Sequence, residues 1–291
     1  MNAKTLDPKT IRRHFEQAAK SYDEVAVLQQ EVCRRLIERL DYIRLQPQTI
    51  LDLGAGTGQG IRLLFDKYPK SHIIALDIAL NMLEKTAQQG RWFRRPQLLC
   101  ANAEQLPLKS ASMDLIFSNL ALQWCDLKQT LLHCRRVLKP QGLLLFSTFG
   151  PDTLKELKES WQQIDQHQHV NEFVDMHDIG DQLLATGFAH PVMDAETIVL
   201  TYDEVTQLLQ DLKAIGATNA NHQRHSGLTT LSKMKRLYRA YEIFRDNQKK
   251  LPASYEIIYG HAWVPDAPIP SKHPNMIGIR AINQQSKGNG F

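Results

Sequence analysis

The sequence predicts an α/β fold, in which a mostly parallel sheet is covered by helices on both faces. Between residues 49 and 149, short apolar runs alternate with amphipathic stretches of helical length, which is the pattern of successive βαβ units. After this core one more strand is expected at 197–201, and the last strand returns only near the C-terminus, after a long helical stretch. We therefore expect a helical insertion before the last strand of the sheet.

The apolar runs place the strands of the core at residues 49–54, 72–77, 97–101, 113–118 and 143–149. Between them, apolar residues recur at spacings of three and four in 58–67, 80–89 and 127–138, which predicts helices. Strands that alternate with helices of this length are expected to pair in parallel.

Outside this core, helices are predicted at 8–41, 177–185, 203–215 and around 234–244, and strands at 197–201 and 254–263. Asp203 is a suitable N-cap for the helix at 203–215, and Gly216 lies just past its end, where glycine is common. We expect a helical cap at 1–47, the α/β core at 48–202, a helical insertion at 203–252, the last strand with its return to the core at 253–282, and a polar, disordered tail at 283–291.

Composition excludes several classes of protein. The chain has 291 residues and a net charge of +4, which is mild for a dedicated nucleic-acid binder. Its four cysteines, at 33, 100, 125 and 134, show no CxxC or clustered spacing, so we expect neither a disulfide framework nor a metal site. No stretch has the roughly 18 apolar residues of a membrane helix, and no signal peptide is recognisable. These features favour a cytoplasmic protein that does not bind membranes.

A glycine-rich loop, Gly54-Ala-Gly-Thr-Gly-Gln-Gly60, joins a predicted strand to a predicted helix. In this context a loop lets its backbone approach a ligand closely. The dinucleotide pattern GxGxxG started at Gly54 requires glycine at position 59, which is Gln59. The Gly-Lys-Ser/Thr of a Walker loop is also absent. The loop therefore disfavours both phosphate-binding patterns.

Two acidic residues sharpen the choice of ligand. Asp52 precedes the loop, where it would repel a pyrophosphate and attract an amino group or a sulfonium. Asp77 ends the next predicted strand, where a carboxylate can bind both ribose hydroxyls. Together they indicate a site for a cationic nucleoside, and S-adenosylmethionine fits that description.

The motifs Asp52-x-Gly54-x-Gly56-x-Gly58, Asp77, Asn102–Pro107 and Arg136–Pro140 resemble those of class I methyltransferases. The resemblance implies a Rossmann-like sheet of seven strands and a site in which Asp52 and the loop hold the methionine portion, Asp77 the ribose, and Ala103 with its neighbours the adenine. Many relatives have Asp at the position of Asn102, although an amide oxygen can accept the same hydrogen bond. The implied cofactor-binding residues are Asp52, Gly54, Ala55, Gly56, Gly58, Asp77, Ile78, Asn102, Ala103, Glu104, Asn119 and Leu120. Asp114 and Arg136–Pro140 are interpreted as structural.

More specific motifs lie at Phe15–Asp23, Leu120–Cys125, Ser147–Leu157, His169–Gly180 and Tyr255–Trp263. They resemble those of the malonyl-acyl-carrier-protein O-methyltransferase family of biotin synthesis, and the similarity covers about residues 11–265. The family methylates the free carboxylate of a malonyl thioester. A carboxylate has a reference pKa near 4 and is already ionised at neutral pH, so no general base is expected. Catalysis would rest on in-line placement of the reactants and on a closed site that excludes water.

The acceptor side is less constrained by sequence. Tyr22, Trp124, His169, Asn171 and Arg224 are the candidates for substrate contacts, and His177 is a further polar candidate. Tyr22 and Trp124 fit ordinary packing equally well, and Arg224 is the candidate partner of the malonyl carboxylate. The implied acyl carrier protein is acidic, so the polar helix face with Lys235, Arg236 and Arg239 is expected to dock it. Malonyl-coenzyme A is the alternative substrate.

Three other functions remain open from the sequence. One is methylation of another small acid or of a ring acceptor, which often requires a base. Another is a methyltransferase-like assembly factor that binds a protein partner. A nicotinamide oxidoreductase is disfavoured by Gln59 and Asp52.

Overall fold

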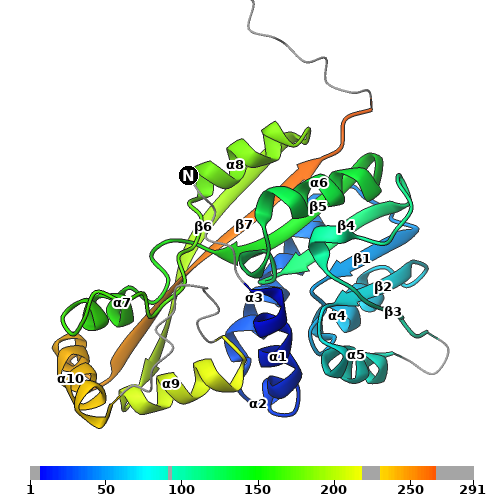
Figure 1. Ribbon diagram of the computed structural model, residues 1–291. Helices are drawn as coiled ribbons and strands as arrows, with labels where there is room; N and C mark the ends of the chain where they lie inside the picture. Colours follow the sequence, from blue (N-terminus) through cyan, green and yellow to red (C-terminus); the bar gives the residue numbers. More distant parts are fainter. Residues whose placement is uncertain (1–6, 91–93, 218–229, 267–291) are drawn as a thin grey trace, which may run out of the picture.

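The structure is a computed structural model that describes residues 7–90, 94–217 and 230–266. Seven strands form one sheet in the order β3-β2-β1-β4-β5-β7-β6 (Figure 1). The pairs from β3 to β5 are parallel, whereas β7 pairs antiparallel with both β5 and β6. Among the described strands, β7 therefore runs against the other six. This topology confirms the predicted seven-stranded, mostly parallel sheet.

The strands are β1 (Thr49–Leu53), β2 (His72–Asp77), β3 (Gln97–Cys100), β4 (Met113–Asn119), β5 (Leu138–Phe149), β6 (Ala189–Tyr202) and β7 (Leu251–Trp263). The α-helices are α1 (Pro8–Ala18), α2 (Tyr22–Val25), α3 (Val27–Arg39), α4 (Gln59–Lys67), α5 (Leu80–Thr86), α6 (Leu127–Val137), α7 (Lys155–Gln162), α8 (Met176–Ala185), α9 (Val205–Ala214) and α10 (Leu231–Tyr241). Single 3₁₀ turns lie at Leu40–Tyr42, Ala87–Gln89, Ala103–Gln105, Leu122–Trp124 and Glu242–Phe244.

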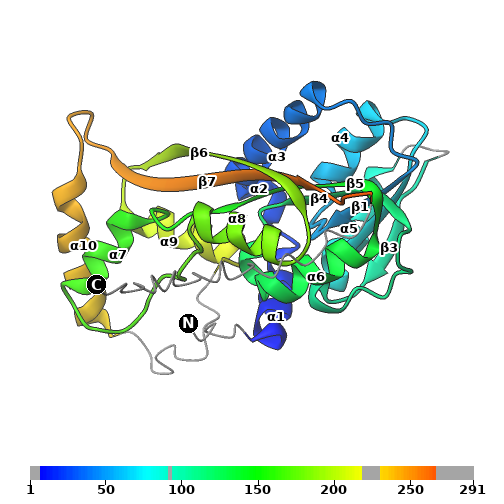
Figure 2. The same cartoon turned by 90° about the horizontal axis from the view of Figure 1, so that it is seen from above.

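Alternate residues of the central strands enter two different cores, as a pleated sheet requires. In β4, Leu115 and Phe117 pack in the core that includes α3 and α4, whereas Ile116 packs in the core that includes α6 and α8. Figure 2 shows α3 and α4 on one side of the sheet and α6 and α8 on the other. The two-sided covering explains why the core strands are apolar on both faces.

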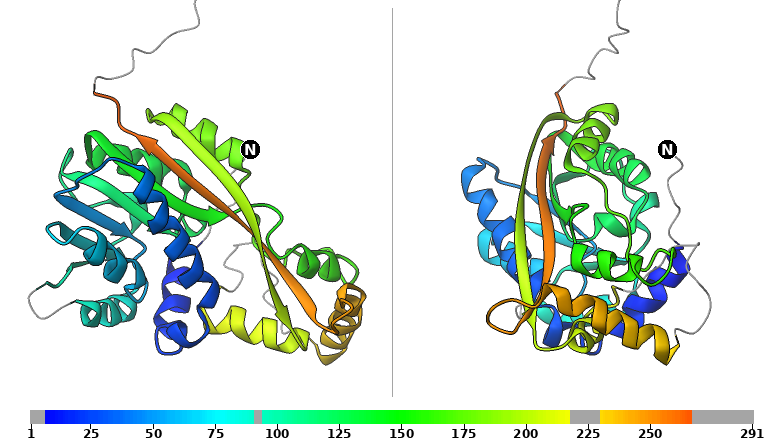
Figure 3. Two further views of the ribbon diagram at one scale, coloured as in Figure 1. Left: turned by 180° about the vertical axis from the view of Figure 1, so that it is seen from behind. Right: turned by 90° about the vertical axis from the view of Figure 1, so that its left-hand side faces the viewer.

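Strand β6 is much longer than the sequence predicted, whereas β7 begins only three residues before the predicted 254–263. The predicted strand at 197–201 is the end of β6, which begins at Ala189. The first part of β6 was not predicted because it contains charged residues. Asp194 and Glu196 form ion pairs with Arg39 and Arg35 of α3, and ion pairs between distant residues give no periodic pattern in the sequence. Figure 3 shows β6 and β7 extending past the core toward α7, α9 and α10.

Several predicted boundaries change. The N-terminal stretch is broken into α1, α2 and α3. Asp203 is not the N-cap of α9; Glu204 caps it, through a capping box with Gln207. Gly216 does follow the helix, with a φ of 74°. β5 starts at Leu138 instead of the predicted 143, so part of the Arg136–Pro140 segment, interpreted as structural, belongs to a strand.

Helix α7 was not predicted at all. It packs on α10 and on β7, so its apolar face is covered by elements distant in sequence. No described helix is long and apolar enough to span a bilayer.

Candidate active site

The glycine loop after β1 adopts a backbone that glycine favours. Gly54, Gly56 and Gly58 have φ values of 76°, 55° and 91°, in the left-handed region where a Cβ is unfavourable. A Cβ on Gly54 would also lie 2.3 Å from the Cβ of Ala121, whereas one on Gly56 would face open space. The loop thus lets Ala121 approach on one side and leaves room beside Gly56 on the other.

Asp52 and Asp77 are buried beside this loop, with exposed fractions of 2% and 8%. Asp77 accepts hydrogen bonds from the backbone N–H groups of Gly56 and Ala79, each at 2.9 Å. The Oδ2 atom of Asp52 is buried and has no hydrogen-bond partner among the described residues. Burial and the charge of Asp77 raise the pKa of Asp52 to about 8, and burial raises the pKa of Asp77 to about 6. An unpartnered buried carboxylate of this kind calls for a cationic ligand, so the residues fit the amino group of S-adenosylmethionine.

Two adjoining cavities open beside the loop among the described residues, and the space within them, including the part open to solvent, is about 760 and 430 Å³. They lie at the carboxyl ends of β1, β2 and β4, where open α/β sheets bind ligands. Tyr22, Gly54, Gly56 and Asn119 line both cavities. Of the other predicted residues, the larger cavity is lined by Asp77, Ile78, Asn102, Ala103, Glu104, Leu120 and Trp124, and the smaller by Asp52 and Ala55.

The N-terminal helix α1 covers the larger cavity. Ile11 and Phe15 line it, and the ring of Phe15 meets that of Trp124 edge-on, with 5.5 Å between centroids. Glu16 fixes the helix, because its carboxylate accepts hydrogen bonds from the N–H groups of Leu80 at 2.9 Å and Asn81 at 3.0 Å. Glu16 was not predicted as a site residue, because it lies on an amphipathic helix with no motif of its own.

A second link joins α2 to the glycine loop. The hydroxyl of Thr57 donates a 2.5 Å hydrogen bond to Asp23, beside Tyr22. Burial, together with the charges of Asp77 and Asp23, raises the pKa of the Tyr22 phenol, so its hydroxyl keeps its proton at neutral pH. Tyr22 thus offers a neutral phenol at the junction of the two cavities.

The floor of the larger cavity contains a strained residue, Leu120, with a φ of 48°. Its N–H lies within hydrogen-bond distance of the Ser147 hydroxyl and carbonyl, at 3.0 and 3.1 Å, and its carbonyl accepts a bond from Gln123 at 2.5 Å. The Ser147 hydroxyl donates to Asn119, whose amide nitrogen donates to the Gln29 carbonyl of α3. Hydrogen bonds on both sides hold Leu120 in a conformation that a non-glycine residue rarely adopts.

The turn at Ala103–Gln105 closes the opposite end of the cavity. The side-chain oxygen of Asn102 accepts a hydrogen bond from the N–H of Glu104 at 3.0 Å. The carboxylate of Glu104 in turn accepts a bond from the N–H of Asp126, before α6. Both side chains therefore shape the turn, and an amide oxygen retains a second lone pair for a ligand.

Other predicted site residues lie away from these cavities. Gly58 caps α4, and a Cβ there would stand 2.7 Å from the side chain of Gln89. The ring of His169 stacks on Trp161 at 3.6 Å and is hydrogen-bonded to Asp165. His177 is exposed at the start of α8.

Asn171 is 8% exposed, and its side-chain oxygen has no hydrogen-bond partner in the described part of the chain. Arg224 lies outside the described residues. Asp114, interpreted as structural, accepts bonds from the N–H groups of Gln48 and Thr49 and from Lys139. These contacts join the amino ends of β1 and β4, whereas the cavities lie at the carboxyl ends.

The three cations predicted to dock a carrier differ in their surroundings. Arg236 donates to the carbonyl of Gln163 at 3.2 Å, after the end of α7. Lys235 and Arg239 are exposed, and their side chains make no hydrogen bond or ion pair with a described residue. Arg236 is exposed as well, so the three cations differ only in that Arg236 is hydrogen-bonded to the end of α7.

Comparison with known proteins places this site in a family. A family model described as a methyltransferase domain matches residues 51–146, the segment that carries the glycine loop, Asp52 and Asp77. A malonyl-acyl-carrier-protein O-methyltransferase of Gallionella capsiferriformans is 50% identical over 272 residues, which cover 91% of this chain and 93% of the relative. A protein of the same name from Coxiella burnetii is 43% identical, with 89% and 88% covered. The chain belongs to the malonyl-acyl-carrier-protein O-methyltransferase family. It is an S-adenosylmethionine-dependent O-methyltransferase.

Solved structures support the fold of this O-methyltransferase. The YcgJ protein of Bacillus subtilis superimposes with a TM-score of 0.57 at 17% identity, covering 81% of this chain and 99% of that one. The cyclase SpnF also matches, with a TM-score of 0.51 at 16% identity and 82% of each chain covered. A cyclase with this fold shows that architecture alone does not define the reaction.

Proposed function

We propose that this O-methyltransferase methylates the free carboxylate of a malonyl group carried as a thioester on acyl carrier protein, as a step of biotin synthesis. The observation that carries the proposal is the 50% identity, over 91% of the chain, to a relative named for that substrate. The composition of the site agrees with it. No histidine or lysine lines either cavity among the described residues, and a carboxylate acceptor requires no base to ionise it.

The reaction balances without proton transfer. S-Adenosylmethionine supplies an electrophilic methyl group on a sulfonium. A malonyl carboxylate oxygen forms a bond to the methyl carbon while the carbon–sulfur bond breaks and its electron pair passes to sulfur. The products are a methyl ester and a neutral thioether, so opposite charges disappear in the transition state. A site closed against water favours such a step.

The cavity residues divide between the parts of the cofactor. We assign Asp52 and the loop from Gly54 to Gly56 to the methionine portion and Asp77 to the ribose. Ile78, Asn102, Ala103 and Glu104 form the adenine end, and Asn119 and Leu120 lie below the reacting centre. Trp124, held edge-on by Phe15, and Tyr22 close the site from above.

On the acceptor side, Tyr22 and Trp124 line the larger cavity, and Asn171, which lines neither cavity, is a further candidate for a substrate contact. Its buried side-chain oxygen lacks a donor among the described residues, and an acyl carrier arm carries amide N–H groups. His169 is occupied by Asp165 and Trp161, so we assign it to the support of that segment. We place the reaction in the cytoplasm, and the four free thiols agree with a reducing compartment.

Mass spectrometry provides the direct test. The protein is incubated with S-adenosylmethionine and malonyl-acyl carrier protein, and the expected product is heavier by one methylene unit. Asp77→Ala should weaken cofactor binding by about 1–3 kcal/mol if buried hydrogen bonds to the ribose are lost. Tight cofactor binding by the wild-type protein without methylation of malonyl-acyl carrier protein or malonyl-coenzyme A would reject the proposal.

A further inference from the structure

Helix α10 exposes a row of four residues at intervals of four. Leu231, Lys235, Arg239 and Ile243 follow one another along the helix and the 3₁₀ turn that extends it, and this spacing places neighbours on one face. Leu231 is 82% exposed and Ile243 is 67% exposed. We call these four residues the outer row; its large apolar side chains lie at the ends and its cations in the middle.

Other side chains of α10 attach the helix to the rest of the protein. Leu237 and Tyr241 are buried in the core, Lys233 forms a 2.8 Å ion pair with Asp165, and Arg236 donates to the end of α7. These contacts fix the helix on α7 and direct the outer row away from it. The side chains of Lys235 and Arg239 make no such contact with a described residue, so their charges are free to meet a partner.

The segment that carries this row is basic in sequence, and three of its cations, Lys233, Arg245 and Lys250, form ion pairs with Asp165, Glu242 and Asp203. Residues 231–250 contain seven Lys and Arg and two acidic residues, a net charge of +5, whereas the whole chain has +4. The remaining residues are therefore slightly acidic in sum. A local basic surface on a nearly neutral protein selects an acidic partner and speeds its approach.

We propose that the outer row is the docking surface for the acidic carrier protein, with Lys235 and Arg239 meeting carboxylates and Leu231 and Ile243 packing against apolar side chains of the carrier. This inference rests on the proposed function and revises the expected docking residues. Arg236 leaves the set, and the two exposed apolar residues enter it. Large apolar side chains beside cations are the composition that supplies energy at protein interfaces.

The β-sheet gives the distance from this surface to the reaction site. Tyr241 of α10 donates a 2.9 Å hydrogen bond to the carbonyl of Pro252, near the start of β7. Seven residues later, Tyr259 pairs with Ser147, whose hydroxyl accepts a hydrogen bond from Leu120. At about 3.3 Å per residue, the path along β7 is roughly 23 Å. A carrier docked on α10 must therefore deliver its thioester on a long, slender arm.

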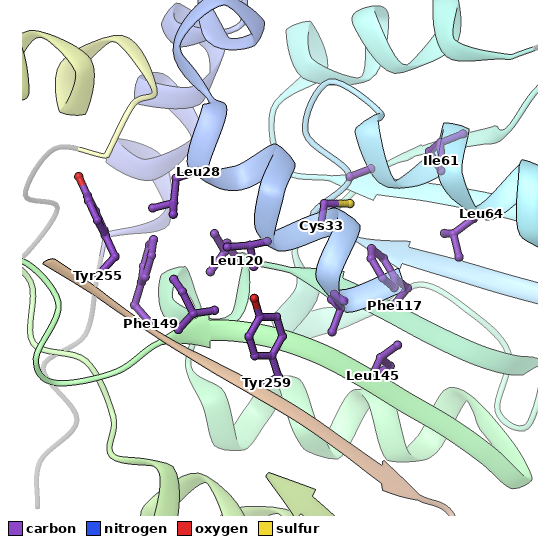
Figure 4. Packing of buried hydrophobic residues seen from close by; sticks show 14 of the residues in the cluster. Leu28, Cys33, Ile61, Leu64, Phe117, Leu120, Leu145, Phe149, Tyr255 and Tyr259 are labelled. Carbon is purple, nitrogen blue, oxygen red and sulfur yellow. The ribbon is translucent and has the colours of Figure 1, made fainter. Parts of the chain in front are cut away.

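Apolar side chains lie along the inner end of this path. Tyr255 and Phe149, whose ring centroids are 6.0 Å apart, belong to the same core as Leu28 and Leu120. Figure 4 shows these four residues between α3 and β7.

The test measures the activity of the wild-type protein and of a charge-reversed variant on two substrates, malonyl-acyl carrier protein and malonyl-coenzyme A. In K235E/R239E, kcat/KM for malonyl-acyl carrier protein should fall at least tenfold, through KM, while values for malonyl-coenzyme A change less than twofold. The matched control K70E/K109E carries the same charge change on exposed side chains that make no hydrogen bond or ion pair with a described residue and should leave both substrates unaffected. L231S/I243S should raise KM for the carrier substrate alone.

Equal losses on both substrates in K235E/R239E, or no loss on the carrier, would overturn the docking surface. So would loss of binding to anionic phosphatidylserine vesicles with unchanged carrier kinetics, which would make the row a membrane contact. Failure of the proposed function is a separate result, in which the wild-type protein methylates neither thioester.

Discussion

Gly60, in the first turn of α4, leaves the space that the Asp52 carboxylate occupies, because a Cβ on residue 60 would stand 2.8 Å from Oδ2 of Asp52. That oxygen is the buried atom without a partner among the described residues, so the glycine keeps the proposed amino-group site open. A residue outside the conventional glycine motif thus borders the proposed amino-group site.

Gly60→Ala should therefore weaken cofactor binding. The added methyl forces the carboxylate or α4 to move, at a cost of about 1–3 kcal/mol. This corresponds to roughly a 5- to 150-fold loss of affinity, measured by calorimetry with S-adenosylhomocysteine. Gly180→Ala in α8 is the matched control, because a Cβ there meets nothing within 4 Å. Equal affinities in the two variants would contradict the assignment of Asp52.

Cofactor affinity should increase with pH. Asp52 has a pKa of about 8 in the ligand-free protein, and it must lose its proton to bind an ammonium group. Between pH 6 and 8 the association constant should rise by up to about tenfold per pH unit, and the slope should disappear in Asp52→Asn. Calorimetry in buffers of different ionisation enthalpy measures the proton released; an absent release would refute the prediction.

The same carboxyl group should make the ligand-free protein less stable as pH rises. Its pKa is raised from the reference value of 3.8 to about 8, so its contribution to stability is full below pH 4 and is lost as pH rises toward 8. The unfolding free energy of Asp52→Asn, relative to wild type, should increase by on the order of 1 kcal/mol per pH unit between pH 5 and 8. Urea unfolding of both proteins measures these free energies. If the prediction is wrong, the difference in unfolding free energy between Asp52→Asn and wild type will stay constant from pH 5 to 8.

Glu16→Ala should loosen the cap over the larger cavity. It removes the acceptor for the N–H groups of Leu80 and Asn81, with an expected cost of about 1–2 kcal/mol. We expect faster dissociation of S-adenosylhomocysteine in stopped-flow experiments. Glu24→Ala, an exposed acid in the same cap, should leave the rate unchanged; identical rates in all three proteins would exclude a role of Glu16 in closure.

Ser147→Ala should lower kcat more than it lowers stability. The substitution removes the hydroxyl that donates to the side-chain oxygen of Asn119 and accepts from the N–H of Leu120. Because both residues lie near the proposed reacting centre, we expect their displacement to lower kcat about 10–100-fold. Ser160→Ala also removes a buried serine hydroxyl, which bonds only to a helix carbonyl, and should keep full kcat. Similar kcat values for the two variants would show that Ser147 is purely structural.

The core of the fold and much of the cofactor site could be predicted because their signals are local. Apolar runs located β1, β2 and β4 within one or two residues, and the spacing of Asp52, the glycines and Asp77 was sufficient to indicate the ligand. Such signals depend on residues close together in the chain, where backbone conformation and strand ends are decided.

The missed features depend on contacts between distant residues. The pairing of Glu16 with the start of α5, and of Thr57 with Asp23, spans 64 and 34 residues, and neither pair has a spacing pattern. The first half of β6 was not predicted because its charged residues form ion pairs with arginines of α3. The docking trio was predicted from one helix alone and stays a prediction; the hydrogen bond of Arg236 to the end of α7 depends on tertiary packing and has no signal in that helix.

The reversed direction of β7 has an evolutionary consequence. The chain departs from the core along β6, builds α9 and α10, and re-enters between β5 and β6. A single continuous gene segment between Tyr202 and Leu251 can therefore be exchanged while β1, β2 and β4 keep their order and their acids.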